Sequence, residues 1–502
     1  MNKRYIKLIG VVMLLSTLTA CKKWVENNPH DSFLVTDLDY LKSESDYRTM
    51  AISVYSPVQW LNQVVVIGDI ASDNSVAGGE NASDVLALQQ IDDFTLTPVN
   101  STLEDLFRVA YEGVNRANYM IQYKDKNKAG EVVTFNGKDA LYGEVNFLRA
   151  YYYFTLVKMW GDVPLFTDRR LGLEDLKGLP RNPKAEVYAQ IEKDLNAAIA
   201  ALPATQSQKG RVTKYAAQAL LGKVYLYENK FTEAAAILEP IITSNAYSLV
   251  SDYASIYLAA GENGPESVFE IQYTNGSPYY NWGGATRGQG NYAVQQNGVR
   301  GISGSASMPY AAGWSTNLPT QNLAAAYTAG DKRKDVTVLD IEAYKNAHPN
   351  YNLVYQVAPY KNTGLYNQKY LPRKGETSGQ VELNYLNNFR VLRYSEVLLM
   401  AAEAINRSNG GDAKAQDYLN RVRARAFGDN LHNVTATGDA LKQAIWNERR
   451  LELAMDGDRF FDLVRTGQAA SKLQGFVAGK NELFPIPQEE INVSGITQNP
   501  GY

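Results

Sequence analysis

The sequence predicts a mainly α-helical fold, in which a tetratricopeptide-like scaffold of about four helix pairs carries large, irregular, loop-rich insertions. Three observations lead to this prediction. Apolar residues recur at helical spacing in several segments that short turns separate. One of these segments carries a helical-repeat signature. Two long segments, residues 60–100 and 261–388, show little helical periodicity.

Residues 1–20 are typical of a secretory signal peptide. Basic residues (Lys3, Arg4 and Lys7) precede an apolar run that is shorter than the roughly 20 residues of a membrane-spanning helix. Small residues then lead to Cys21, and the string LTAC over 18–21 resembles the lipobox of bacterial lipoproteins. In such proteins the cysteine carries the lipid. We therefore expect lipidation at Cys21 and a polar tether over 21–40; an ordinary signal peptide with a chance cysteine is the alternative.

The body, 41–502, is expected to hold helical repeats at about 42–260 and 389–465. Residues 221–225 read LGKVY and match the L-G-x-x-Y pattern of a tetratricopeptide helix. A short turn and a second helix with small residues follow, which would let the two helices approach closely. The predicted pairs are about 42–56 with 103–123, 140–160 with 185–202, 213–228 with 231–244, and 390–408 with 412–426.

Composition argues against several classes of function. The net charge of the 502-residue chain is −3 and no long basic run is present, so nucleic acid is not an expected partner. Cys21 is the only cysteine, and a lipid on it would leave no thiol for disulfides, nucleophilic catalysis or metal ligation. The three histidines, His30, His348 and His432, lie far apart in sequence. We therefore expect no metal site, no catalytic residue and no cofactor.

Several strings, in order along the chain, resemble one family, the SusD/RagB-like outer-membrane lipoproteins. Residues 144–154 read EVNFLRAYYYF, residues 393–404 read RYSEVLLMAAEA and residues 445–454 read IWNERRLELA. Residues 160–165, WGDVPL, and the closing strings PIPQEE and QNPGY match the same family.

The resemblance implies a lipid-anchored, non-enzymatic binding protein at the outer membrane that faces the cell surface. It would capture an oligosaccharide or polysaccharide and deliver it to a SusC-like TonB-dependent transporter. The family also has a RagB branch, which implies peptides as an alternative ligand. A periplasm-facing tetratricopeptide scaffold for other proteins is a further alternative.

The candidate ligand-binding residues lie in the two segments with little helical periodicity. Aromatic faces suit the C–H groups of a sugar ring, whereas Asn, Asp and Arg side chains suit its hydroxyl groups. The aromatic residues of segment 261–388 have two possible roles: they contact the ligand, or they only hold the loops against the scaffold. The loop between the first two helices is polar enough for hydroxyl recognition, but it is equally compatible with a capped turn. The candidates are Trp282, Trp314, Tyr279, Tyr280, Tyr292 and Tyr310 from segment 261–388, and Trp60, Asp69, Asp73 and Asn74 from the earlier loop.

Glu448 and Glu452 form a pair of carboxylates that could suggest a glycosidase. They are four residues apart and project from one face of the expected helix. Arg449 and Arg450 lie between them, and Arg459 and Asp462 follow. Because arginine pairs with carboxylates in a fork geometry, this pattern favours a structural ion-pair network over a catalytic pair.

Overall fold

The computed structural model describes residues 40–281 and 287–502. The predicted signal peptide, Cys21, nearly all of the tether, and Trp282 therefore lie outside the described residues. The chain divides into two compact units, one made of residues up to Arg48 together with Tyr123–Phe135, and a larger one made of Thr49–Gln122 and Asn136–Tyr502.

In the smaller unit, the described residues are held by one aromatic contact and a few hydrogen bonds. The rings of Tyr47 and Phe135 lie 5.6 Å apart between centroids, and the Tyr47 hydroxyl donates to the carbonyl of Tyr123 at 3.1 Å. Asn127 Nδ2 donates to the carbonyl of Leu41 at 3.3 Å. Tyr47 lies on α2 (Glu44–Trp60), whose remaining residues, from Thr49 on, belong to the larger unit.

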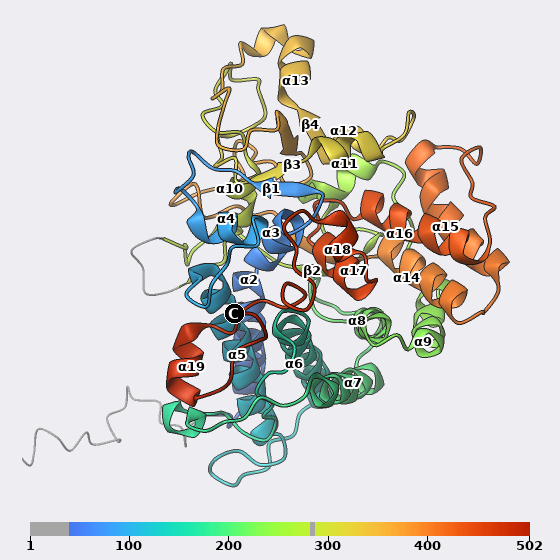
Figure 1. The fold of residues 1–502 in the computed structure, drawn as a ribbon. Helices are drawn as coiled ribbons and strands as arrows, with labels where there is room; N and C mark the ends of the chain where they lie inside the picture. Colours follow the sequence, from blue (N-terminus) through green and yellow to red (C-terminus); the bar gives the residue numbers. More distant parts are fainter. Residues whose placement is uncertain (1–39, 282–286) are drawn as a thin grey trace, which may run out of the picture. The chain divides into compact units, whose positions relative to one another are not determined.

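Long helices that pack on their neighbours in sequence form the scaffold of the larger unit (Figure 1). The mainly α-helical fold class is therefore confirmed. In chain order these helices are α5 (Ser101–Gln122), α6 (Lys138–Trp160), α7 (Lys184–Ala201), α8 (Lys214–Tyr227), α9 (Phe231–Thr243), α14 (Tyr394–Arg407), α15 (Asp412–Phe427) and α16 (Gly438–Glu452).

Three of the four pairs predicted from sequence are found among these contacts. Helix α6 packs on α7, α8 on α9 and α14 on α15. For the first predicted pair, Arg116 of α5 donates to the carbonyl of Ser53 on α2 at 2.7 Å. That these pairs are tetratricopeptide repeats stays a prediction.

Local sequence explains where helix α8 begins and why it meets α9 closely. The Thr213 hydroxyl caps the helix by accepting from the Ala216 N–H at 3.1 Å. Gly222 faces Leu238 of α9, and a Cβ at this glycine would lie 2.5 Å from the leucine Cδ2. The glycine of the repeat signature is therefore needed for the spacing of the two helices.

Within the part of the chain that the structure describes, three two-stranded antiparallel sheets connect segments that are distant in sequence. Strand β2 (Ser267–Ile271) pairs with β6 (Phe389–Arg393), so the two ends of the long insertion meet. Strand β1 (Ser75–Ala77) pairs with β3 (Asn317–Pro319), and β4 (Val338–Asp340) pairs with β5 (Leu365–Asn367).

The segment 60–100 is more regular than its sequence indicated. It contains α3 (Gln63–Ile70) and α4 (Leu86–Asp92). Most of α3 is buried, including Val66, Ile67, Gly68 and Ile70, so this helix has no polar stripe. A helix that is apolar on nearly all sides gives no amphipathic period, which explains why the sequence pattern did not predict it.

The insertion 261–388 has a small hydrophobic core of its own. Ile341 of α13 (Ile341–Ala347) belongs to this core. The other short helices of the insertion are α10 (Ala293–Asn297), α11 (Gln321–Ala326) and α12 (Lys334–Thr337). Most of them lie in the yellow part of Figure 1. The core consists of Val299, Ile302, Met308, Tyr310, Leu318, Leu339, Ile341, Leu353, Tyr355, Tyr366 and Leu371. Some of the loop aromatics are thus ordinary core residues.

The C-terminal segment returns to the end of α6. After α16 come α17 (Arg459–Arg465), α18 (Ala469–Lys472) and α19 (Gln488–Ser494). The Trp160 indole N–H donates to the carbonyl of Pro485 at 3.0 Å, and Asn499 Nδ2 donates to the carbonyl of Trp160 at 3.0 Å. The closing PIPQEE and QNPGY strings therefore join the C-terminus to the WGDVPL turn.

Candidate functional site

Two tyrosines of the insertion, Tyr280 and Tyr292, pack on each other beside the loop 272–281, and Tyr279 precedes Tyr280 in the chain. The rings of Tyr280 and Tyr292 lie 5.6 Å apart between centroids, and Tyr292 is the residue directly before α10. Asn384 holds the backbone of Tyr280 through two hydrogen bonds, of 2.8 and 2.9 Å. Tyr279 is 44 % exposed, and its ring lies against Gly379. We refer to Tyr279, Tyr280 and Tyr292 as the tyrosine group.

An ion pair borders the tyrosine group. The Arg287 guanidinium donates to Asp105 on α5, and both side chains keep part of their surface exposed. Burial raises the pKa of Tyr280 and Tyr292. The nearby Arg287 acts to lower both pKa values, but burial outweighs it. Burial lowers the pKa of Arg287 itself, but Asp105 outweighs it and raises that pKa. Tyr280 and Tyr292 are therefore neutral phenols, and they lie beside an ion pair whose charges compensate each other.

Trp60 supports this loop and does not offer an open ring face. Its indole N–H donates to the carbonyl of Gly288 at 3.2 Å. The guanidinium carbons of Arg116 and Arg287 lie 5.3 and 5.4 Å from the centroid of its ring. Such cation–π contacts stabilise the loop and compete with a sugar for the same ring. Trp60 is therefore better placed to position Arg287 than to stack on a ligand.

Trp314 is half-buried and contacts α10. Its backbone N–H donates to the carbonyl of Gln295 at 2.8 Å, one turn along α10 from Tyr292. Its own carbonyl accepts from Arg300 at 2.8 and 3.2 Å, and Arg300 pairs with Asp84 at 2.7 Å. Helix α10 thus connects Trp314 and Arg300 to the tyrosine group.

Tyr310 is a correction to the predicted site. It is 4 % exposed and belongs to the core of the insertion. Its ring centroid lies 5.4 Å from that of Tyr344, and its hydroxyl accepts from Gln368 Nε2 at 3.2 Å. A side chain packed in this way stabilises the insertion and cannot contact a ligand at the surface.

The polar loop Asp69, Asp73 and Asn74 is a second correction. Asp69 is 0 % exposed and accepts from Gly457 N at 3.0 Å and Asn317 Nδ2 at 3.1 Å; burial raises its pKa to about 8. Asp73 accepts two bonds from Arg459, of 2.7 and 2.9 Å. Asn74 is 0 % exposed and accepts from Arg450 Nε at 2.8 Å. The Ser72 hydroxyl closes the turn on the carbonyl of Asp69. The capped-turn alternative therefore describes this loop.

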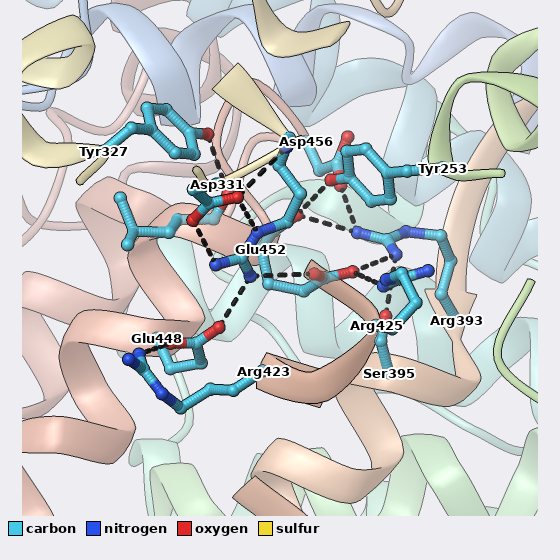
Figure 2. A network of polar contacts seen from close by, with 12 residues as sticks. Tyr253, Tyr327, Asp331, Arg393, Ser395, Arg423, Arg425, Glu448, Glu452 and Asp456 are labelled. Atoms are coloured by element: carbon cyan, nitrogen blue, oxygen red, sulfur yellow. Dashed lines mark hydrogen bonds and ion pairs between the residues drawn. The ribbon is translucent and has the colours of Figure 1, made fainter. Parts of the chain in front are cut away.

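Glu448 and Glu452 lie in a buried ion-pair network (Figure 2). Glu452 contacts three guanidinium groups: Arg425 at 2.6 Å, Arg393 at 2.7 Å and Arg333 at 3.1 Å. Burial acts to raise the pKa of Glu452, but these arginines outweigh it and hold that pKa well below its usual range.

Glu448 shares the same network and contacts Arg423 at 2.6 Å and Arg333 at 2.7 Å. Glu448 is 1 % exposed and Glu452 is 0 % exposed, so neither carboxylate can reach a polysaccharide. The network is structural, as the arginine-rich pattern favoured.

The residues that complete the tyrosine group and its surroundings were not predicted. They are Arg287, Asp105, Asn384, Arg300 and Asp84. Asp105 has the sequence pattern of an ordinary acidic residue in the first turns of a helix. Arg287 and Arg300 carried a weak signal, because each is a cation isolated among glycines and small residues.

Comparison with known proteins identifies the family. A model described as "SusD family" matches residues 265–481, and one described as "Starch-binding associating with outer membrane" matches residues 23–226. A solved structure described as a laminarin-binding SusD-like protein is 34 % identical, covers 92 % of this chain and 100 % of its own, and has a TM-score of 0.82. The chain belongs to the SusD family.

Two further relatives show how much of the chain is shared within the SusD family. Surface glycan-binding protein A from Bacteroides thetaiotaomicron, solved in complex with laminarihexaose, is 28 % identical with a TM-score of 0.79. It covers 91 % of this chain and 99 % of its own. SusD-like protein P2 of Formosa agariphila is 27 % identical over 526 residues, which are 98 % of this chain and 99 % of that protein. The resemblance stated from the sequence is thus confirmed.

Proposed function

We propose that the chain is a non-enzymatic glycan-binding protein of the outer membrane, and that the tyrosine group is part of its binding surface. The observation that carries this proposal is the exposed Tyr279 beside the Tyr280–Tyr292 pair, with Arg287 and Asp105 at its border. We propose Trp314 and Arg300, which are connected to this group through α10, as further ligand contacts.

The chemistry of this surface suits a sugar chain. Tyrosine rings offer flat apolar faces to the C–H groups of a pyranose, and their hydroxyl groups remain neutral at physiological pH. Arg287 and Asp105, which keep part of their surface exposed, supply donors and acceptors for hydroxyl groups, and their opposite charges compensate each other. A neutral polymer therefore meets no uncompensated charge in this group.

Laminarin is the first polysaccharide to test. Relatives at 34 % and 28 % identity are described as binding laminarin or as a complex with laminarihexaose. Both relatives align with more than 90 % of this chain, which supports the same class of ligand here.

In this proposal the lipid on Cys21 holds the body at the cell surface, and a SusC-like TonB-dependent transporter receives the glycan. The tether over 21–40 would let the body move above the transporter. The bacterial lipoprotein carries several acyl chains, because a single chain binds a membrane only marginally.

Affinity electrophoresis through gels that contain a panel of polysaccharides tests the proposal. We expect laminarin to retard the wild-type protein, and Tyr279→Ala to lower the affinity roughly three- to tenfold, because one aromatic contact is worth about 0.5–1.5 kcal/mol. Tyr310→Phe, which changes a core tyrosine, is the matched control and should bind as the wild type does. No release of sugar products is expected. A protein that no polysaccharide retards would contradict the proposal.

A further inference from the structure

A cleft of about 370 Å³ lies beside the residues that support the tyrosine group. It is lined by Tyr55, Ser56 and Gln59 of α2, by the loop 208–211, by residues 269–272 of β2 and its continuation, and by Gln289. The volume is within the range of small-molecule sites, about 300–1,000 Å³. We refer to it as the amide cleft.

The amide cleft has an apolar floor and polar walls. Phe269 and Ile271 are buried and form its base, together with Val58. The Tyr55 hydroxyl donates to Glu144 at 2.6 Å and the guanidinium carbon of Arg211 lies 5.9 Å from the centroid of its ring, so this side chain is a fixed part of the wall. Glutamine amides make much of the wall: Gln59, Gln208, Gln272 and Gln289. An apolar surface with converging amides is suited to a ligand that combines C–H faces with hydroxyl groups.

The charges that line the amide cleft are already paired, apart from one at its rim. Arg211 donates to Glu144 at 2.9 Å, and Glu270 accepts from Asn263 N and Asn388 Nδ2, each at 3.0 Å. Lys209 is exposed and, within residues 40–281 and 287–502, has no ion pair. A neutral ligand therefore fits this cleft better than an anionic one. An anionic ligand would need more positive charge than the Lys209 ammonium group at the rim supplies.

Some amide capacity in the walls is left for a ligand. Gln59 Nε2 donates to the carbonyl of Gln272 at 2.8 Å, so Gln59 Oε1 is available to accept a hydrogen bond from a ligand. For the Gln289 side chain, no hydrogen bond is found with any part of the chain that the structure describes. Gln272 is saturated by Asn263 and Asn388 and serves as a fixed wall.

The amide cleft and the tyrosine group share their supporting residues. Gln59 precedes Trp60 on α2, and Gln289 follows Gly288, whose carbonyl accepts from the Trp60 indole. Arg287, at the border of the tyrosine group, is two residues from Gln289. The two surfaces thus share a support, the Trp60–Gly288 hydrogen bond.

We propose that the amide cleft is a second subsite for the same neutral glycan and takes the part of the chain that extends beyond the tyrosine group. This rests on the proposed glycan-binding function. It adds a dependence on chain length: long oligosaccharides would occupy both surfaces, whereas short ones would occupy the tyrosine group alone.

Calorimetric titration of the full-length protein with laminarihexaose and laminaritriose tests the second subsite. Ser56→Trp places a large ring in the cleft at the cost of one long hydrogen bond, of 3.3 Å to the Ile52 carbonyl. We expect it to lower the affinity for laminarihexaose about tenfold, the loss of one or two hydrogen bonds, and to leave laminaritriose unchanged. Gln289→Ala should act in the same direction without adding bulk.

Ser471→Trp is the control, because Ser471 is also a helical serine whose hydroxyl donates to a backbone carbonyl, that of Gln468 at 2.8 Å; Ser471 is exposed, whereas Ser56 is half-buried. It should bind both sugars as the wild type does. If Ser56→Trp and Gln289→Ala bind both sugars like the wild type, the subsite is refuted while glycan binding stands. Equal loss at both lengths also refutes it. If neither sugar binds the wild type, both the second subsite and the assignment of laminarin as the ligand are contradicted.

Discussion

Glu452 is enclosed by three guanidinium groups and has no exposed surface. Its backbone carbonyl also accepts, from the Tyr253 hydroxyl at 2.7 Å and from Arg393 at 3.0 Å. Each arginine was desolvated when the chain folded, and this cost is offset only while the carboxylate remains ionised. The residue is therefore an electrostatic centre for α14, α15, α16 and the insertion.

Replacing the charge of Glu452 should be strongly destabilising. We expect Glu452→Gln to lower the free energy of unfolding by about 3–5 kcal/mol, because it leaves buried guanidinium groups without their counter-charge. Urea unfolding followed by circular dichroism measures this. Glu174→Gln is the control: Glu174 is 88 % exposed and paired with Lys177, so its loss should stay within about 1 kcal/mol. A Glu452 variant as stable as this control would contradict the structural role of the network.

Asp69 should make stability depend on pH in an unusual direction. Burial raises its pKa to about 8 in the folded protein, whereas the unfolded value is 3.8. Between these values the folded state binds more protons, so stability should fall as the pH rises from 5 to 7.5, by up to about 1.4 kcal/mol per pH unit from this residue.

The variant Asp69→Asn cannot release this proton, and its stability should vary less with pH over the same window. Urea midpoints measured at several pH values provide the comparison. Glu228, whose pKa burial raises to about 7, titrates in both proteins and cancels in the difference. Parallel pH profiles for the variant and the wild type would show that Asp69 is ionised in the folded protein.

At the scale of the element, α3 is held against the turn before α17 by a backbone contact. A Cβ at Gly68 would lie 1.8 Å from the carbonyl oxygen of Gly457, and a backbone atom cannot move aside as a flexible side chain can. The two elements also share the hydrogen bond from Gly457 N to Asp69. The close approach of α3 therefore depends on a residue without a side chain.

Gly68→Ala should destabilise the protein by about 1–3 kcal/mol, although alanine has the better helix propensity by about 1 kcal/mol. Thermal unfolding measures the change. Gly172→Ala is the control, because a Cβ there meets only the Asp175 carboxylate, at 3.7 Å. An unchanged melting temperature for Gly68→Ala would mean that α3 can move away from this turn.

The elements that sequence predicts and those it does not differ in a physical way. Helices such as α5 and α8 have a polar and an apolar side, or a repeat signature, and their pattern is visible in the chain. Helix α3 is buried on nearly all sides, and strands β1 and β3 are only three residues long. None of these elements therefore shows a hydrophobic periodicity in the sequence.

The candidate site is only partly visible in sequence for a similar reason. Tyr279, Tyr280 and Tyr292 stood out by residue type, but Tyr310 had the same pattern and is a core residue. Asp69 and Asp73 resembled ligand-binding groups, yet their partners Gly457 and Arg459 lie nearly 400 residues away. Burial and long-range pairing decide these roles, and the local sequence does not contain them.

At the scale of the whole molecule, the proposed lipid anchor decides where the binding surface acts. Cys21→Ser should move the protein from the membrane fraction to the soluble fraction and abolish acylation, because no other cysteine is present. Metabolic labelling with a fatty-acid analogue, followed by fractionation, measures both effects. Lys22→Ala should remain acylated and serves as the control. Membrane retention of an unacylated Cys21 variant would show that another contact holds the protein there.

Arg333 has a consequence for protein engineering. It lies in the long insertion, is 0 % exposed, and pairs with Asp331, Glu448 and Glu452. The insertion therefore contains the tyrosine group and also supplies, through Arg333, the positive charge that pairs with the carboxylates of α16. A chimaera in which the corresponding segment of a relative replaced residues 261–388 would change the ligand specificity. It would also change the ion pairs that stabilise α16 in the helical scaffold. Exchange of the loop 272–281 alone would keep Arg333 and its partners in place.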